Sequence, residues 1–232
     1  MEDLGSLGGS TSSAFDVNGR GEIVGRSESS TGAHAFRWAE RGGMEDLGTL
    51  RQNDAGSSTA IGITDNGVIF GHSETESGAS HGFKWTKADG MIDLGTLSGV
   101  GDSVARDGHT RGIVVGRSFQ TTDFDTRRAV KWMDGEIADL GTLYQDNSGV
   151  SEAFAVNNKG VVVGFSQADV TTGSAIRTPA VKWIDGEIFD LGTLRDDNSD
   201  FSDARGINSQ GTIVGQSREA DGTEVHAACW GC

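Results

Sequence analysis

The chain has 232 residues, of which 36 are Gly and one is Pro, and its formal net charge is −15. This length and composition suit a single, turn-rich β domain. The acidic charge argues against nucleic acid and anionic membranes as partners. No apolar run approaches the length that spans a membrane, so we expect no membrane insertion.

The sequence is a tandem repeat. The tetrapeptide Asp-Leu-Gly-Ser/Thr begins at five positions spaced 43, 47, 46 and 51 residues apart, namely Asp3, Asp46, Asp93, Asp139 and Asp190. A Trp recurs in the same register, at Trp38, Trp85, Trp132, Trp183 and Trp230. A period of this size is typical of propellers, solenoids or stacked arrays.

Four short segments follow one another in each repeat. In the first repeat they are Ser12 to Asn18, a run ending in Val24-Gly25, His34 to Trp38, and Met44 to Gly48. Each is bounded by Gly, Asn, Asp or Ser and mixes β-branched or aromatic residues with small ones, which predicts strands. Asp134-Gly135 and Asp185-Gly186 predict type I′ turns between the third and fourth strands, which are then antiparallel neighbours.

Four antiparallel strands repeated five times fit a propeller, a sandwich or an open solenoid. The chain opens on Met1 to Gly5, a fourth-strand segment, and closes on His226 to Trp230, a third-strand segment. An open stack needs polar capping repeats, which the sequence does not show. A ring in which the first strand completes the last blade leaves no unpaired outer strand.

We therefore predict an all-β fold, a five-bladed β-propeller of four-stranded antiparallel blades. It forms one domain over residues 1–232, with repeats at about 6–49, 50–96, 97–142, 143–193, and 194–232 completed by 1–5. The ring is closed by the N-terminal strand and is expected to be monomeric.

Three linked motifs resemble a known repeat family. They are Asp46-Leu-Gly-Thr-Leu50, the pattern A-x-x-φ-N-x-x-G-x-φ-V-G over Ala153 to Gly164, and His34-Ala-Phe-Arg-Trp38. They recur in register over essentially the whole chain and resemble the bacterial and archaeal HAF repeat, described as a probable extracellular repeat. Later repeats depart from the HAF triplet, reading His81-Gly-Phe83, Arg128-Ala-Val130, Pro179-Ala-Val181 and His226-Ala-Ala228.

The resemblance implies a propeller fold and an extracellular or cell-surface location, but it carries no activity to these positions. Met1 occupies the strand position of Met44 and Met91, so we expect no signal peptide within the sequence given. We expect the leader of a secreted protein to lie outside this sequence.

Cys229 and Cys232 form a C-x-x-C pair without the βαβ context of a redox enzyme. In a fully extended chain their Cα atoms lie about 10 Å apart, too far for a disulfide, whereas a turn at Trp230-Gly231 brings them closer. A structural or incidental pair is therefore favoured over a redox or metal site.

The recurring Trp and His residues have a structural and a functional interpretation. Aromatic faces stack on sugars, but the place of each Trp on a middle strand favours packing between blades. His34, His81 and His226 hold one repeat position and are expected to make a recurring hydrogen bond.

Positions that vary within a regular repeat are candidates for function, because the scaffold does not fix them. The residue after the Val-Gly pair, or its equivalent, ends the second strand on one predicted propeller face. These ligand-binding candidates are Arg26, His72, Arg117, Phe165 and Gln216.

The inner strand supplies the candidate catalytic residues, Asp16, Arg106, Asp107, His109 and Arg205. Asp, Arg and His that converge at the mouth of a central channel suit an anionic or polyhydroxyl ligand, or acid and base catalysis. The favoured alternative is that Arg106 and Arg205 form ion pairs with Asp on adjacent blades, since five narrow blades leave little channel volume. Side chains of Asp16 and Asp107 that turn into blade interfaces would rule out the enzyme interpretation.

Acidic loops of the last repeats contain oxygen ligands that suit calcium, with candidates Asp196, Asp197, Asp200 and Asp203. No full EF-hand pattern is present, and Asp, Asn and Ser are also common turn formers. A turn without metal is preferred, and no cofactor is expected.

Two classes of function remain. The preferred one is an extracellular binding module that recognises a glycan or a protein ligand on one propeller face, because no motif specific to a catalytic mechanism is present. The alternative is an enzyme of the hydrolase or lyase class, acting on a polar substrate such as a carbohydrate at the channel mouth.

Overall fold

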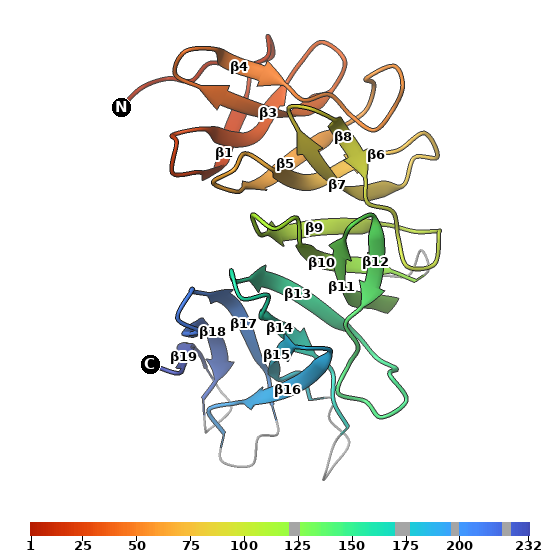
Figure 1. Ribbon diagram of the computed structural model, residues 1–232, viewed down its shortest axis with the longest axis vertical. Coiled ribbons are helices and arrows are strands. Elements are labelled where there is room, and N and C mark those ends of the chain that lie inside the picture. The colour runs from red at the N-terminus through yellow and green to blue at the C-terminus, as the bar shows by residue number, and fades with distance from the viewer. Residues whose placement is uncertain (121–125, 170–176, 196–199, 220–223) are drawn as a thin grey trace.

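The computed structural model describes residues 1–120, 126–169, 177–195, 200–219 and 224–232 (Figure 1). The regular elements in these ranges are all β-strands, which confirms the all-β prediction. The described residues contain no apolar helix of membrane-spanning length.

The strands form five antiparallel sheets that follow the chain. Sheet 1 contains β1 (Ser12–Val17), β2 (Ile23–Glu28), β3 (Ala33–Ala39) and β4 (Gly43–Asp46). Sheet 2 contains β5 (Ser58–Ile63), β6 (Ile69–Glu74), β7 (Ser80–Thr86) and β8 (Gly90–Asp93). Sheet 3 contains β9 (Ser103–Gly108), β10 (Val114–Phe119), β11 (Arg127–Met133) and β12 (Glu136–Asp139). Sheet 4 contains β13 (Ser151–Val156), β14 (Val162–Ser166), β15 (Ala180–Ile184) and β16 (Glu187–Gly192). Sheet 5 contains β17 (Ser202–Ile207), β18 (Ile213–Arg218) and β19 (Val225–Trp230).

The predicted hairpin turns are present. Asp134 and Asp185 have φ angles of 55° and 53°, and Gly135 and Gly186 follow with 83° and 85°. Positive φ at both central residues is the requirement of the type I′ turn, so the third and fourth strands pair antiparallel as predicted.

The first strand of every sheet carries a β-bulge. In sheet 1, Ala14 pairs with Gly25 and Asp16 pairs with Val24, so Phe15 has no partner. A Cβ at Gly25 would lie 2.0 Å from the carbonyl oxygen of Ser13, and a similar approach recurs at Gly71, Gly116, Gly164 and Gly215. The bulge therefore explains why the second strand of each repeat keeps a glycine.

Neighbouring sheets pack through apolar cores. Between sheets 3 and 4, Val115 and Ala129 contact a cluster that includes Ala153, Val162 and Trp183. Equivalent clusters join the other neighbours. Burial of the Trp of sheets 2, 3 and 4 agrees with the packing interpretation of this residue.

A serine at the start of the first strand also links neighbouring sheets. Ser58 Oγ accepts a hydrogen bond from the Ala35 amide of sheet 1 at 2.8 Å and donates one to the Gly48 carbonyl at 2.6 Å. The same serine of the next three sheets accepts a hydrogen bond from the amide at the Ala35 position of the preceding sheet. These serines are Ser103, Ser151 and Ser202. The repeat thus encodes the sheet interface as well as the sheet.

The five sheets lie in a curved row with sheets 1 and 5 at its ends (Figure 1). The predicted strand formed by Met1 to Gly5 is absent from the structure: these residues are in no strand, and sheet 5 has three strands. The curvature of the row leaves β1 and β19 apart, so no strand of the described residues lies along the outer edge of β19. The structure therefore has blade-like sheets in an open row, not a closed ring.

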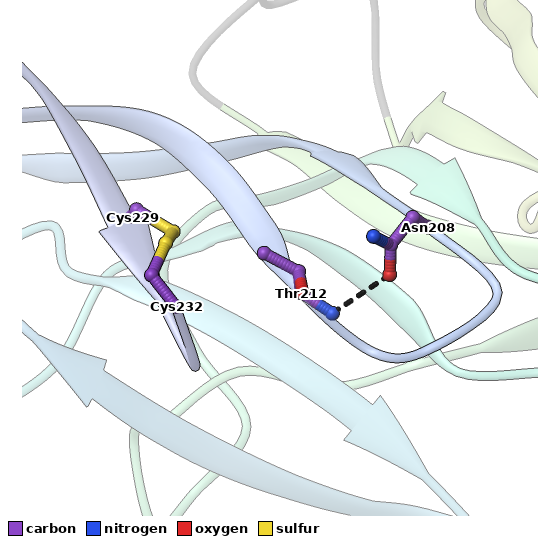
Figure 2. The surroundings of a disulfide bond; sticks show 4 residues. All are labelled: Asn208, Thr212, Cys229 and Cys232. Carbon is purple, nitrogen blue, oxygen red and sulfur yellow. Dashed lines mark hydrogen bonds between the residues drawn. A yellow bond between two sulfur atoms is a disulfide. The ribbon is translucent and has the colours of Figure 1, made fainter.

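Cys229 and Cys232 form a disulfide beside the β17–β18 hairpin (Figure 2). Gly231 has a φ angle of 78°, and the two Cα atoms are 6.2 Å apart. The turn at Trp230-Gly231 therefore brings the two cysteines together, as the sequence analysis requires for a disulfide.

Candidate ligand-binding site

The bulges of sheets 3, 4 and 5 direct side chains toward one pocket. Their unpaired residues are Arg106, Phe154 and Arg205. All three line an open pocket of about 410 Å³, which we call the arginine–phenylalanine pocket. Bulges commonly re-aim side chains beside functional sites.

Glu152 is the centre of the ionic interactions in this pocket. It is the second residue of β13, and its side chain is 4% exposed. Arg106 Nη2 lies 2.9 Å from Oε1, Arg117 Nη1 donates to both oxygens at 2.8 and 3.0 Å, and Arg127 Nε lies 3.5 Å from Oε2. Charge-assisted hydrogen bonds of this kind offset the cost of burying a carboxylate.

Arginine and phenylalanine side chains stack along the wall. The Arg127 guanidinium lies 5.4 Å from the Phe165 ring centroid, and that of Arg205 lies 5.2 Å from the Phe154 ring. The two rings are 5.8 Å apart. Such cation–π contacts fix the planes of the guanidinium groups and leave aromatic surface beside their donors.

The second carboxylate of the pocket, Asp203, is also occupied. Arg205 donates to its two oxygens at 3.0 and 2.7 Å, and Gln216 Nε2 donates to Oδ2 at 3.1 Å. Asp203 is buried, whereas the Arg205 side chain is 59% exposed. The cation therefore faces solvent and the anion does not.

Positive charge extends from the pocket to His72 on β6. Burial lowers the pKa of His72, and the positive charges of Arg106, Arg117 and Arg26 lower it further. Its Nδ1 atom is buried and has no hydrogen-bond partner in the described part of the chain. The neutral form of this histidine is therefore favoured.

The structure brings four of the five ligand-binding candidates to this region. Phe165 lines the pocket, and Arg117 and Gln216 donate hydrogen bonds to its carboxylates. His72 is close enough to Arg106 and Arg117 for their charges to lower its pKa. Arg26 lies on the end sheet, where it lines a separate hollow of about 170 Å³.

The candidate catalytic carboxylates serve the sheet interfaces. Asp16 Oδ2 accepts the Ile63 amide and Asp107 Oδ2 accepts the Val156 amide, each at 2.8 Å and each from the next sheet. Burial raises the pKa of Asp107, although its backbone hydrogen bonds act in the opposite direction. Asp16 and Asp107 thus turn into the interfaces between sheets, which argues against a catalytic role for either carboxylate.

His109 lies away from the pocket, in the turn after β9. Its Nδ1 accepts the Arg111 amide at 3.1 Å. Partial burial and the charge of Arg111 lower the pKa of His109. The predicted constellation of Asp, Arg and His is therefore not assembled.

The predicted arginine ion pairs exist with different partners. Arg106 does pair across a sheet interface, but with a Glu, and Arg205 pairs within its own strand. The reason is that position two of the first strand is acidic in sheets 4 and 5, which places Glu152 and Asp203 beside these arginines.

Two calcium candidates, Asp196 and Asp197, lie outside the described residues. Asp200 lies 3.4 Å from Arg218 and 3.9 Å from Arg195, and Asp203 is bound by Arg205. Cationic neighbours compete with a metal ion for these carboxylates.

The recurring histidine makes the predicted hydrogen bond in two sheets. His34 Nδ1 and His81 Nδ1 lie 2.9 Å from Asp46 and Asp93 on the fourth strand. The hydrogen bond with Asp93 raises the pKa of His81. His226 differs, because sheet 5 has no fourth strand within the described ranges, and His226 instead lies 3.3 Å from Glu224.

Sequence reasoning missed Arg127, Glu152, Phe154 and Phe201 as pocket residues. One signal could have identified Glu152: position two of the first strand is Ser13, Thr59 and Val104 in the first three repeats and becomes acidic in the fourth. The bulge that exposes Phe154 cannot be read from residue types alone.

No protein-family model matches the chain, and a search of curated proteins finds no match. The resemblance to the HAF repeat therefore remains a prediction from the sequence motifs.

Proposed function

We propose that this chain is a non-catalytic, extracellular binding module of the HAF-repeat type that recognises a glycan at the arginine–phenylalanine pocket. The observation that carries the proposal is the convergence of guanidinium donors and phenylalanine faces on one open pocket. Apolar walls with a few placed polar groups are typical of small-ligand sites.

A glycan suits both surfaces of this pocket. The partly exposed ring of Phe154 provides a platform for the C–H face of a sugar ring, and the buried ring of Phe165 packs beside it. Guanidinium groups offer several N–H donors in a fixed plane, which suit hydroxyl and carboxylate oxygens. The openness of the site to solvent fits one unit of a longer chain.

The carboxylates of the pocket support binding rather than hydrolysis. A glycosidase needs two carboxyl groups free to act on the scissile bond. Glu152 is surrounded by three arginines, and Asp203 is bound by Arg205 and Gln216. Neither is placed to exchange protons with a ligand, so a binding role is favoured.

We further propose that the open row closes into a five-bladed propeller. The segment before β1 keeps the local structure that ends a fourth strand: the Gly5 amide donates to Asp3 Oδ1 at 2.9 Å, and Gly5 has a φ angle of 78°. The same bond recurs in the four other repeats, at Gly48, Gly95, Gly141 and Gly192. The N-terminal segment thus has the conformation of a strand end without its strand partner.

The two ends of the row offer complementary groups for this closure. Ser12 Oγ donates to the Gly5 carbonyl at 2.7 Å, as Ser58 does to Gly48, but no amide of another sheet donates to Ser12 in the described part of the chain. The Ala227 amide of β19 occupies the repeat position of the donor, Ala35. His226 and Asp3 likewise occupy the positions of the His34–Asp46 pair.

The disulfide between Cys229 and Cys232 supports an extracellular location, because disulfides persist in oxidising compartments. This agrees with what the resemblance to the HAF repeat implies.

A glycan array probed with the folded protein, with and without millimolar calcium, tests the proposed function. We expect reproducible binding to one glycan class that Phe154→Ala abolishes. Phe189→Ala is the matched control, since Phe189 lies on the outer strand β16, away from the pocket. Its ring also contacts a cation, the ammonium group of Lys182 on β15. An array that stays silent under both conditions, or binding that survives Phe154→Ala, would contradict a glycan module of this geometry.

A further inference from the structure

The arginine–phenylalanine pocket is not a by-product of the repeat. Grooves that the repeat does produce lie between hairpins, beside Trp132 and Trp183, and have volumes of about 70 and 150 Å³. The larger pocket is instead lined in large part at positions where the repeats differ, among them the bulge residue and the residue two positions before it, and Phe165, which pairs with Glu152. Its chemistry is therefore particular to sheets 3, 4 and 5.

The pocket is electropositive within an acidic protein. Four guanidinium groups, from Arg106, Arg117, Arg127 and Arg205, surround two carboxylates, which leaves a net charge of +2 in a chain whose net charge is −15. Both carboxylates are buried. A ligand that enters from solvent therefore meets the arginines before the acidic groups.

The arginines keep hydrogen-bonding capacity on the solvent side. Side chains of Arg106, Arg127 and Arg205 are 33%, 31% and 59% exposed, although each contacts a carboxylate. One carboxylate shared by three guanidinium groups cannot satisfy all of their N–H donors.

We infer that the ligand of this pocket is a negatively charged sugar ring, of the uronic acid or sulfated class, with its anionic group held by Arg106, Arg127 and Arg205. This inference rests on the proposed function and names its substrate class. The ring of the sugar lies against the partly exposed Phe154, whose ring adjoins the stacked Arg205 guanidinium and packs beside the buried Phe165. Bidentate contact between a guanidinium and a carboxylate or sulfate gives the site its preference for charge.

The test compares charged and neutral glycans by isothermal titration calorimetry. The probes are uronic acid oligomers, a sulfated galactan and a neutral galactan of equal length, with acetate and sulfate ions as separate arms. We expect a charged oligomer to bind at least about tenfold more tightly than the neutral one, with affinity that falls as salt screens the arginines.

Arg205→Gln is the informative variant, because this side chain is the most exposed of the three and its partner Asp203 keeps the hydrogen bond from Gln216. It should weaken binding by about tenfold through loss of charge-assisted bonds. Arg41→Gln removes the same charge from an exposed hairpin turn and should leave binding unchanged. A thermal melt of both variants checks that they remain folded.

Three outcomes would overturn the inference. Equal affinity for the neutral galactan would leave the glycan module standing and remove the charge preference. Acetate or sulfate that binds as tightly as the oligomers would show that no sugar ring is recognised. An Arg205→Gln variant with unchanged affinity would place the ligand elsewhere. Silence of every glycan would instead contradict the proposed function itself.

Discussion

The interfaces inside the row and the two end faces are made from the same repeat positions but differ in what covers them. Val163 on β14 is fully buried between sheets 4 and 5, whereas Val214, at the same repeat position on β18, is 51% exposed. At the other end of the row, Val17 on β1 is 58% exposed, while its counterpart Val156 is buried. Each end is thus one half of an interface that lacks its other half.

The comparison teaches that the repeat encodes an interface and not only a sheet. Burying one Val stabilises a fold by about 1.5–3 kcal/mol. The open row lacks this burial of Val at both ends. It also lacks, between sheets 5 and 1, the serine hydrogen bond that is present at all four interfaces between consecutive sheets. Closure of the ring restores both, which is why we expect it.

The largest effect should come from a charge placed in an interface. Val163→Asp buries an unpaired carboxylate and should cost about 4 kcal/mol or more, enough to unfold the protein. Val214→Asp should cost at least about 2 kcal/mol if the ring closes over it. Chemical denaturation measures both, with Val100→Asp in an exposed loop as the control. A Val214→Asp variant as stable as Val100→Asp would mean that the end face stays open.

Glu152→Gln should cause the next largest loss in the free energy of unfolding. The substitution removes the charge that three arginines share between sheets 3 and 4, which leaves three partly buried guanidinium groups without an anion and should cost about 3 kcal/mol. Urea unfolding at neutral pH measures it. A loss below about 0.5 kcal/mol would show that the ion cluster is not part of what joins these sheets.

A change of pH probes an ionic cluster on an end sheet. Burial alone would raise the pKa of Glu22, but hydrogen bonds from Asn18, Arg37 and Arg20 lower it to about 2. Because the folded-state pKa lies below the ordinary glutamate pKa of 4.5, the stabilisation is present above that pH and is lost as the pH falls toward 2.

Glu22→Gln should therefore cost about 2 kcal/mol at pH 7 and reduce the loss of stability between pH 4.5 and 2. Melting curves across this range measure the effect. A variant whose acid dependence matches that of the parent would contradict the depressed pKa.

The smallest expected loss of stability comes from alanine substitutions at two serines that hold the same repeat position. Ser58→Ala leaves the Ala35 amide and the Gly48 carbonyl without their shared partner and should cost about 1–2 kcal/mol. Ser12→Ala should cost the same if Ala227 donates to it in a closed ring, and clearly less in an open row. The difference between the two midpoints in urea is the quantity to measure.

The sequence predicted the sheets well because the signals are local. Gly, Asn and Asp bound each strand, and Asp134-Gly135 and Asp185-Gly186 adopt the turn that their φ preferences favour. The histidine hydrogen bonds of sheets 1 and 2 followed from the repeat register.

The site was predicted only in part, because it depends on contacts between repeats. The position after the second-strand glycine pointed to Phe165 and Gln216, but no local signal pairs Glu152 with arginines about 25 to 46 residues earlier in the chain. The bulge that turns Phe154 into the pocket arises from strand register, which residue type alone does not fix.

The central claim, closure of the ring by the N-terminal segment, can be tested by a cross-link. In sheet 1, Arg37 on β3 faces Glu45 on β4, so the same register in a closed ring places Glu2 opposite Cys229. The double variant Glu2→Cys, Cys232→Ser leaves two cysteines, one at each end of the row. We predict that mild oxidation forms an intramolecular disulfide between positions 2 and 229, detected by peptide mass in a monomer on a non-reducing gel. Free thiols would contradict closure, and a disulfide-linked dimer would show that the edge of β19 is completed by a second copy of the chain.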